Sequence, residues 1–247
     1  MDPLLAILHE DEGILVVNKP AGLVCHPTKG DERSSLAGRV RLHLQVGGPV
    51  HLINRLDRET SGVVVLAKSD HAARELRRQW ESRTVEKTYW SIVHGHVQPE
   101  AGVIDAPLGK DERSAVVVKD CVRADGAKAQ TAFRIRRRFE REGIPYTWLC
   151  VSPVTGRKHQ IRIHLSHLGH PIVGDKLYGL DESWYLKLVQ GELSPQDWRR
   201  LVLPWQALHA HQVVLIWRGQ PWVFKAMPES WFEDFIGAPV DAESEDS

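Results

Sequence analysis

The sequence predicts an α+β protein, because strand-like and helix-like segments are interspersed without a regular strand–helix alternation. Residues 14–17 and 62–69 are short β-branched runs, which are typical of buried strands. Residues 69–83 instead carry apolar side chains four positions apart, at Ala72, Leu76 and Trp80, and this spacing indicates an amphipathic helix. We therefore expect a mixed sheet with flanking helices.

Further strands are expected at residues 87–97, 129–139 and 146–154. Residues 159–171 fit a strand by their strict alternation and a helix by the spacing of their apolar residues. Gly169 with Pro171 two positions later is typical of a helix end, so we favour the helix.

Two helix starts carry capping residues. Ser69 or Asp70 fits the N-cap of the helix at 69–83, and Ser194 followed by Pro195 begins another helix. The second start belongs to an expected helical insertion at about residues 180–206. A short closing helix is expected at residues 228–239, where four bulky apolar residues cluster: Trp231, Phe232, Phe235 and Ile236.

The 247 residues are enough for one large domain or two small ones. Because there is no internal repeat or low-complexity linker, we expect a single domain over residues 1–236. The last residues, 237–247, are acidic and predict a disordered tail.

The composition limits the cellular location. No apolar run approaches the ~20 residues that a membrane span needs, and the acidic N-terminus lacks the basic region of a signal peptide. The three cysteines, Cys25, Cys121 and Cys150, show no paired metal spacing. Reduced thiols in a cytoplasmic protein are the simplest interpretation.

The charge is unevenly distributed although 32 basic residues balance 32 acidic ones. Seven acidic residues follow Lys225, so residues 1–228 hold 32 basic against 25 acidic side chains. Local basic clusters lie at residues 77–83 and 133–141. Such a cluster is either a solvated face or a surface that follows a phosphate backbone, and the residues alone leave both interpretations open.

Several familiar functional motifs are missing from the sequence. There is no glycine-rich dinucleotide loop, no phosphate-binding loop and no Gly-x-Ser-x-Gly nucleophile elbow. The thirteen histidines include two H-x-H pairs, but none comes with a carboxylate at hydrolase spacing. We therefore expect no catalytic metal.

Residues 51–62, HLINRLDRETSG, place Asp57 between Arg55 and Arg58. A carboxylate buried alone would become neutral, whereas nearby guanidinium groups hold it ionised. The arrangement fits either a structural ion pair at a turn or a catalytic carboxylate, and the spacing alone does not decide between them.

The wider sequence resembles the RluA-type family of pseudouridine synthases, whose signature is R-L-D-x-x-T-S-G. Residues 51–69 match that signature, and other blocks follow the family's order. These are VVNKPAGLVCHP, EKTYWSIVHG, PVTGRKHQIRIHLSHLGHPIVGDKLYG and ALHAHQVVL. Together the blocks cover about residues 14–225, most of the chain.

The resemblance implies the family's catalytic α+β domain, with a bent, mixed and largely antiparallel sheet. It also implies that a uridine in RNA is detached at its glycosidic bond, turned over and rejoined through carbon 5, without a cofactor or metal. Asp57 matches the catalytic aspartate, and Tyr89 matches the tyrosine whose ring lies against the target base. Arg162 matches the basic partner, which is expected to form a salt bridge with Asp57.

The target base must leave its stack to reach a buried carboxylate, which favours RNA loops over helices. Arg55 is placed to fill the vacated position or to bind the flanking phosphate, although a purely structural role is also open. Further phosphate contacts are expected from four basic residues: Lys19, Arg58, Arg157 and Lys158.

Two departures from the family pattern stand out. Many relatives carry His where this chain has Asn54, and Asn does not titrate near neutral pH. The insertion at 180–206 is longer than the expected link, and it either extends the surface or helps to choose the RNA. No room is seen for a separate N-terminal RNA-binding domain, so substrate choice is expected within the catalytic domain.

The sequence thus predicts a monomeric RNA-uridine isomerase that acts on an rRNA or tRNA stem-loop. Two alternatives are an RNA-binding or chaperone protein without important catalysis, and a metal-dependent hydrolase that uses the histidines. The presence of Asp57, Tyr89 and Arg162 together argues against the first alternative.

Overall fold

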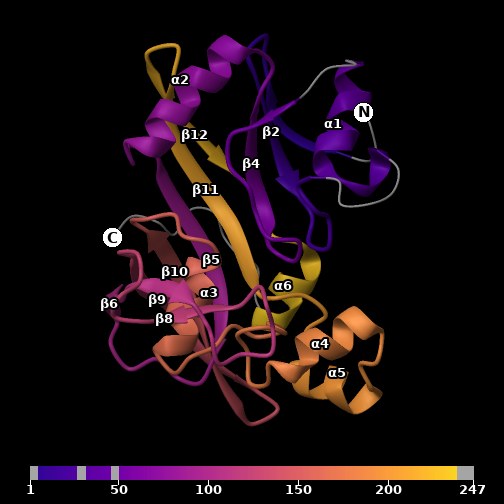
Figure 1. Cartoon of the computed structure of the whole chain (residues 1–247), viewed down its shortest axis with the longest axis vertical. Coiled ribbons are helices and arrows are strands. Elements are labelled where there is room, and N and C mark those ends of the chain that lie inside the picture. The colour runs from indigo at the N-terminus through magenta and orange to yellow at the C-terminus, as the bar shows by residue number, and fades with distance from the viewer. Residues whose placement is uncertain (1–4, 27–31, 46–49, 238–247) are drawn as a thin grey trace. The chain divides into compact units, whose positions relative to one another are not determined.

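The structure, a computed structural model, describes residues 5–26, 32–45 and 50–237 (Figure 1). Its contacts divide the chain into two compact units. Unit 1 comprises residues 1–87 and 209–247, and unit 2 comprises residues 88–208. The expected single domain over 1–236 stays a prediction, and the expected tail lies outside the described residues except for Gly237.

Strand β4, Ser61–Ala67, is the central strand of unit 1, and all seven of its residues are buried. It pairs antiparallel with β2 and β3 and parallel with β11, so the sheet is mixed. Strand β1 pairs antiparallel with β2, and β12 with β11. These partners are β1 Ala6–Glu10, β2 Ile14–Lys19, β3 His51–Leu52, β11 Leu208–Trp217 and β12 Gln220–Lys225.

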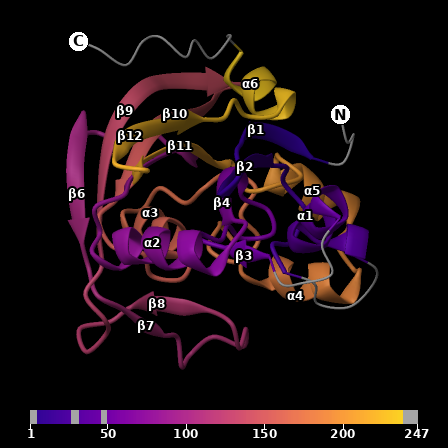
Figure 2. The ribbon, with the colours of Figure 1, turned by 90° about the horizontal axis from the view of Figure 1, so that it is seen from above.

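Helix α2, Asp70–Glu81, packs its apolar side on this sheet. The Ser69 hydroxyl caps the helix by accepting from the Ala72 N–H at 3.2 Å, which confirms one of the two predicted caps. Gln79 ties the other end to β11, since its amide exchanges two hydrogen bonds with the Ile216 backbone. Figure 2 shows α2 and α6, Ser230–Ile236, on opposite sides of the strands of unit 1.

A further helix of unit 1, α1, spans Leu36–Leu44 after a short 3-10 helix at Glu32–Ser34. Ser35 caps α1 by accepting from the Gly38 N–H at 3.1 Å. The sequence pattern did not indicate this helix, because Gly38 and the β-branched Val40 both have low helix propensity.

Unit 2 is built on an antiparallel sheet with strand order β5-β10-β9-β6. These strands are β5 Glu86–His94, β6 Ala101–Asp105, β9 Gln130–Arg141 and β10 Ile144–Pro153. Trp90 of β5 and Trp148 of β10 pack edge to face, with ring centroids 5.4 Å apart. A separate hairpin joins β7, Leu108–Lys110, to β8, Asp120–Val122.

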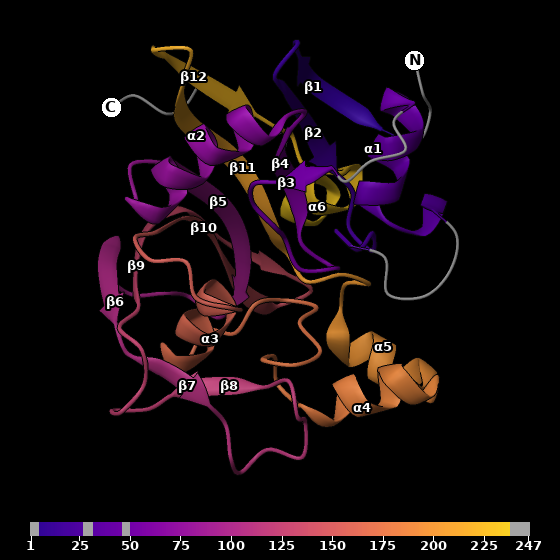
Figure 3. The ribbon, with the colours of Figure 1, turned by 45° about the horizontal axis from the view of Figure 1, so that its top comes forward.

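Helix α3, Gln160–His167, covers the segment that both patterns fitted, and the favoured helix is correct. Gly169 follows at φ +86°, where a side chain would be strained, and the His170 N–H donates to Leu165 O at 3.0 Å. Figure 3 shows the β7–β8 hairpin beside α3, and the helices α4, Ser183–Gln190, and α5, Pro195–Leu201, as a pair.

The predicted α+β class with a mixed, largely antiparallel sheet is confirmed. The long apolar strands and α2 follow their sequence patterns closely. The short edge strands β1, β6, β7 and β8 were not predicted, because they carry few buried apolar residues and are defined by hydrogen bonds to a partner strand.

Candidate functional site

Asp57 lies half-buried in the loop between β3 and β4. The Asn54 side chain ties this loop to the backbone of β4. It donates to Val63 O at 3.1 Å and accepts from the Val65 N–H at 2.8 Å. The Thr60 N–H then closes a turn onto Asp57 O at 3.2 Å. The Asn54 amide therefore hydrogen-bonds to β4 as the backbone of a neighbouring strand would. This role does not need a side chain that titrates.

The segment 19–25 holds the other side of this loop. The Leu56 N–H donates to the buried Cys25 Sγ at 3.4 Å. Gly22 and Arg58 are joined twice: the Gly22 N–H donates to Arg58 O at 2.9 Å, and Arg58 Nε donates to Gly22 O at 3.1 Å. The Asp57 loop is thus fixed between β4 and this segment.

Lys19 is fully buried, and its ammonium donates to three backbone carbonyls, those of Pro20, Leu23 and Arg58, at 2.8–3.1 Å. This burial argues against the predicted phosphate contact, because no part of the side chain is exposed. Burial also lowers the pKa of Lys19 to about 8, although the nearby charge of Asp57 acts in the opposite direction. Lys19 is a buried cation that holds the loop and acts electrostatically on Asp57.

The last two residues of the signature, Ser61 and Gly62, both contact β11. Any Cβ on Gly62 would lie 2.2 Å from Ala210 O, and its φ of +114° is strained for other residues. The Ser61 hydroxyl is 2.8 Å from His209 Nδ1, and His209 Nε2 is 2.9 Å from Ala226 O. Because a carbonyl only accepts, Nε2 carries the proton and Nδ1 accepts from Ser61. Burial lowers the pKa of His209 to about 4, so the ring is neutral.

Tyr89 and Arg162 both belong to unit 2. Tyr89 is half-buried on β5, opposite Val151 of β10. Arg162 is buried on α3 and forms two hydrogen bonds to Asp175, from Nε at 2.7 Å and from Nη2 at 2.9 Å. The expected salt bridge between Arg162 and Asp57 joins residues of different units and stays a prediction.

Asp175 is the residue that the sequence interpretation missed. It also accepts from the backbone N–H groups of Leu177 and Tyr178, both at 2.9 Å. Burial acts to raise the pKa of Asp175, but the Arg162 charge and these hydrogen bonds outweigh it and hold the pKa below its ordinary value. The available signal was its position as the acid of the block GDKLYG, which follows the apolar residues Ile172 and Val173.

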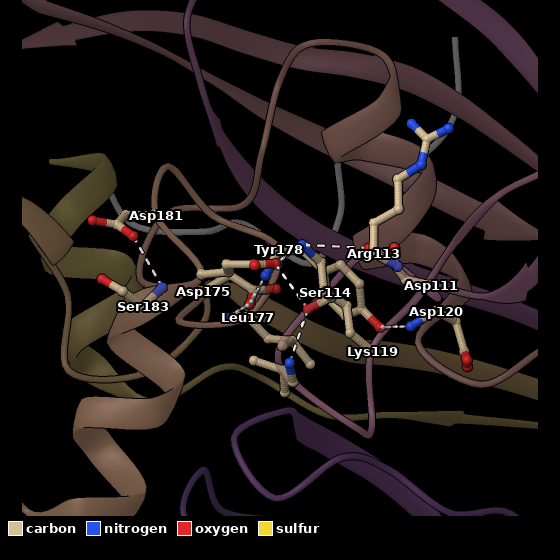
Figure 4. A network of polar contacts seen from close by, with 12 residues as sticks. Asp111, Arg113, Ser114, Lys119, Asp120, Asp175, Leu177, Tyr178, Asp181 and Ser183 are labelled. Atoms are coloured by element: carbon tan, nitrogen blue, oxygen red, sulfur yellow. Dashed lines mark hydrogen bonds and ion pairs between the residues drawn. The ribbon is translucent and has the colours of Figure 1, made fainter.

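Tyr178 connects Asp175 to the β7–β8 hairpin, as Figure 4 shows. The Arg162 guanidinium lies 4.9 Å from the centre of the Tyr178 ring. The tyrosine hydroxyl accepts from the Asp120 N–H at 3.2 Å and lies 2.9 Å from His159 Nδ1. Burial raises the pKa of Tyr178, so the hydroxyl stays protonated.

The remaining basic candidates lie on exposed positions. Arg55 and Arg58 are exposed in the Asp57 loop. Arg157 Nε donates to Lys128 O at 3.1 Å, and Lys158 Nζ donates to Val118 O at 2.7 Å. The structure therefore groups Lys19, Arg55, Asp57 and Arg58 in unit 1, and it groups the other four candidates in unit 2: Tyr89, Arg157, Lys158 and Arg162.

Within the described part of the chain, no group of three or more His, Cys, Asp or Glu side chains is arranged to hold a metal ion. None of the helices there is long and apolar enough to cross a membrane. The three cysteines form no disulfide.

Comparison with known proteins identifies the family. A sequence profile of the RNA pseudouridylate synthase family matches residues 13–167. The dual-specificity RNA pseudouridine synthase RluA of Vibrio parahaemolyticus is 40% identical over 200 residues, which are 78% of each chain. An uncharacterized RNA pseudouridine synthase of Aquifex aeolicus is 39% identical over 183 residues, 72% of this chain and 57% of that protein.

Two solved structures share the fold. Human RNA pseudouridylate synthase domain containing 4 is 28% identical with a TM-score of 0.71, over 94% of this chain and 92% of that one. Human RNA pseudouridylate synthase domain containing 1 has a TM-score of 0.72 at 24% identity, over 92% and 86% of the two chains. The chain therefore belongs to the RNA pseudouridylate synthase family, as an RluA-type pseudouridine synthase and thus an isomerase.

Proposed function

We propose that this protein isomerises specific uridines in an rRNA or tRNA stem-loop, with Asp57 as the catalytic carboxylate. In this reaction the bond from the ribose C1′ to N1 breaks and a bond from C1′ to C5 forms. The hydrogen on C5 leaves as a proton, and N1 gains one. Family membership supports the reaction, and the RNA class and the roles of the residues are our proposal.

The observation that carries the proposal is the fixed loop around Asp57. Asn54 binds the β4 backbone on one side, and Gly22 binds Arg58 on the other, so the backbone on both sides of Asp57 is fixed. The neighbouring Lys19 cation favours the ionised carboxylate. An ionised, oriented carboxylate is what glycosidic bond cleavage needs, whether it attacks the sugar or the base or removes a sugar proton.

Tyr89 and Arg162 complete the proposed catalytic set. The Tyr89 ring is proposed to lie against the flipped uracil and to assist proton removal at C5. Arg162 is proposed to pair with Asp57 as well as with Asp175, to which it donates from Nε and Nη2. Its exact orientation is then set by Asp175.

The RNA is proposed to bind with the target base flipped out of its stack, at a cost of a few kcal/mol that a loop reduces. Arg55, exposed two residues before Asp57, fills the vacated position or binds the flanking phosphate. Arg58, Arg157 and Lys158 contact other phosphates, and Lys19 instead supports the loop. We take residues 1–236 as one catalytic domain that acts as a monomer without a cofactor.

The test uses tRNA and rRNA transcripts tritiated at C5 of uridine, because isomerisation releases that tritium into water. Asp57→Asn is expected to bind RNA like the unmodified protein and to release no tritium, since an amide is neither nucleophile nor base. Arg218→Gln, an exposed change beyond β11, serves as the matched control and should keep full activity.

Tritium release by the unmodified protein and the control alone would establish the reaction and show which RNA class it prefers. Substantial turnover by Asp57→Asn would mean that another group performs the chemistry. RNA binding without release from either class would indicate a fold that is used for binding only, and it would overturn the proposal.

A further inference from the structure

Trp198 on α5 is unusual in its exposure. The chain has nine Trp, five Phe and four Tyr residues, all within the described part, and only Trp198 is exposed, at 39%. Trp is enriched at binding interfaces, because its large ring buries apolar area while its N–H can still find a hydrogen-bond partner. This residue belongs to the insertion at 180–206, for which the fold itself gives no function.

The helix that carries Trp198 is firmly held. Ser194 and Asp197 form a capping box, and Pro195 occupies the first turn. The Asp197 carboxylate also accepts from Trp184 Nε1 at 3.2 Å and from Lys187 Nζ at 2.9 Å, which joins α5 to α4. The insertion thus presents Trp198 on a rigid element, so little ordering entropy is lost when a partner binds.

The exposed residues in the second half of α5 are aromatic and basic. Asp197, the helix's acid, is directed inward and buried, whereas Trp198, Arg199 and Arg200 are all exposed. Arg200 lies 5.5 Å from the centre of the Trp184 ring, and its charge, after the larger effect of the Ser183 hydrogen bonds, contributes to lowering the pKa of Asp181. Arg199 has no carboxylate partner among the described residues. A phosphate backbone with unpaired bases is the partner that matches both features, because arginines bind phosphates and any base can stack on an indole ring.

Lys176 connects this surface to the Arg162–Asp175 pair within unit 2. Its buried ammonium donates to Pro204 O at 2.7 Å and lies 5.6 Å from the centre of the Trp198 ring. Gly174 packs so closely on Trp205 that a Cβ there would lie 2.2 Å from Trp205 O. Asp175, which binds Arg162, lies between Gly174 and Lys176 in the sequence. The segment 174–176 therefore contacts both Arg162 and the end of the insertion.

We infer that Trp198, with Arg199 and Arg200, is an RNA-binding surface that stacks on an unpaired base of the substrate RNA and contacts the adjoining phosphates. The inference rests on the proposed function, because it takes the substrate to be a structured RNA with unpaired nucleotides. It assigns the insertion a part in choosing the RNA rather than in the chemistry.

The test measures tritium release and equilibrium binding for Trp198→Ala, Trp198→Phe and Arg199→Gln in the full chain, on the same tritiated tRNA and rRNA transcripts. Trp198→Ala should weaken binding and raise KM roughly 5- to 100-fold, with kcat unchanged, because the lost stacking is remote from the reacting atoms. Trp198→Phe should recover most of the affinity. Arg199→Gln should reduce the slope of log K against log salt by roughly 0.7–0.9.

Val189→Ala is the matched control, since Val189 is 70% exposed on α4 of the same insertion but is not aromatic. It should leave binding and KM unchanged. Thermal melting of each variant checks that the fold is intact.

The outcomes separate this inference from the proposed function. If the unmodified protein releases tritium and Trp198→Ala has the same KM and RNA affinity as the unmodified protein, the inference is overturned and the proposed function stands. Absence of tritium release by the unmodified protein would remove the proposed function. A change in oligomeric state of Trp198→Ala without any change in RNA affinity would assign the surface to a second copy of the chain, against the inference.

Discussion

The Asp175 carboxylate binds the Arg162 guanidinium side on, with Nε to Oδ2 at 2.7 Å and Nη2 to Oδ1 at 2.9 Å. Both side chains are buried, and Asp175 has no exposed surface around its carboxylate. Such a paired geometry fixes the plane of a guanidinium more firmly than a single contact does. Asp175 is therefore placed to orient Arg162.

Asp175→Asn should lower the free energy of unfolding by about 3–5 kcal/mol, because it leaves the Arg162 charge buried without a carboxylate. Urea denaturation measures this loss. The double change Arg162→Met with Asp175→Leu should cost less than Asp175→Asn alone, since it removes both buried charges. Equal or larger destabilisation by the double change would show that the pair itself is strongly stabilising.

Lys19 should make stability depend on pH in alkaline solution. The folded protein releases this proton near pH 8, whereas the unfolded chain holds it to about pH 10.5. The unfolded state therefore binds more protons between these values, and the contribution of Lys19 to the free energy of unfolding rises with pH, by up to roughly 3 kcal/mol.

The comparison with Lys19→Met isolates this contribution. The stability of the unmodified protein should increase relative to that of Lys19→Met between pH 8 and pH 10, as measured by denaturant unfolding at a series of pH values. A difference that stays constant over this range would show that Lys19 has an ordinary pKa in the folded protein.

Gly62→Ala should be severely destabilising, by more than about 3 kcal/mol, because the new methyl group meets the Ala210 backbone and the φ is positive. Gly219→Ala is the matched control. Gly219 also has a positive φ, of +73°, but nothing lies within 4 Å of the point that a Cβ would occupy there. It should cost only about 1–2 kcal/mol, and similar melting temperatures for the two variants would contradict the steric explanation.

Asn54→Ala should reduce turnover more than RNA affinity, because it frees one side of the Asp57 loop from β4. It should also cost about 1–3 kcal/mol of stability, since the Val65 N–H loses its acceptor. Tritium release and RNA binding, measured side by side, check the split. The exposed change Glu12→Gln serves as the control, and an equal loss of turnover and affinity in Asn54→Ala would point to general unfolding instead.

Structural features that depend on residues close together in the sequence could be predicted from it. The buried strand β4, the Ser69 cap of α2, the end of α3 at Gly169 and the Ser194 start of α5 all depend on residues within a few positions of each other. The ambiguous segment 159–171 was resolved for the same reason, because Gly169 and Pro171 stop a helix locally. The RluA-type resemblance rested on ordered blocks and is supported by the family profile and the Vibrio relative.

Contacts between segments that are far apart in the sequence could not be predicted in this way. Lys19 looked like a phosphate ligand because a lysine beside a turn is usually exposed, and only the packing of segment 19–25 on the Asp57 loop buries it. Asp175 was missed because only the fold brings it against Arg162.

The sequence by itself determined the α+β class, the family and the residues proposed for catalysis, because these follow from local patterns and ordered motifs. The tertiary structure alone decided which groups meet: Arg162 with Asp175, 13 residues apart, Lys19 with Arg58, 39 apart, and Ser61 with His209, 148 apart. Such partners are chosen by the need to satisfy buried charges and hydrogen-bonding groups, and that need arises only when the chain has folded.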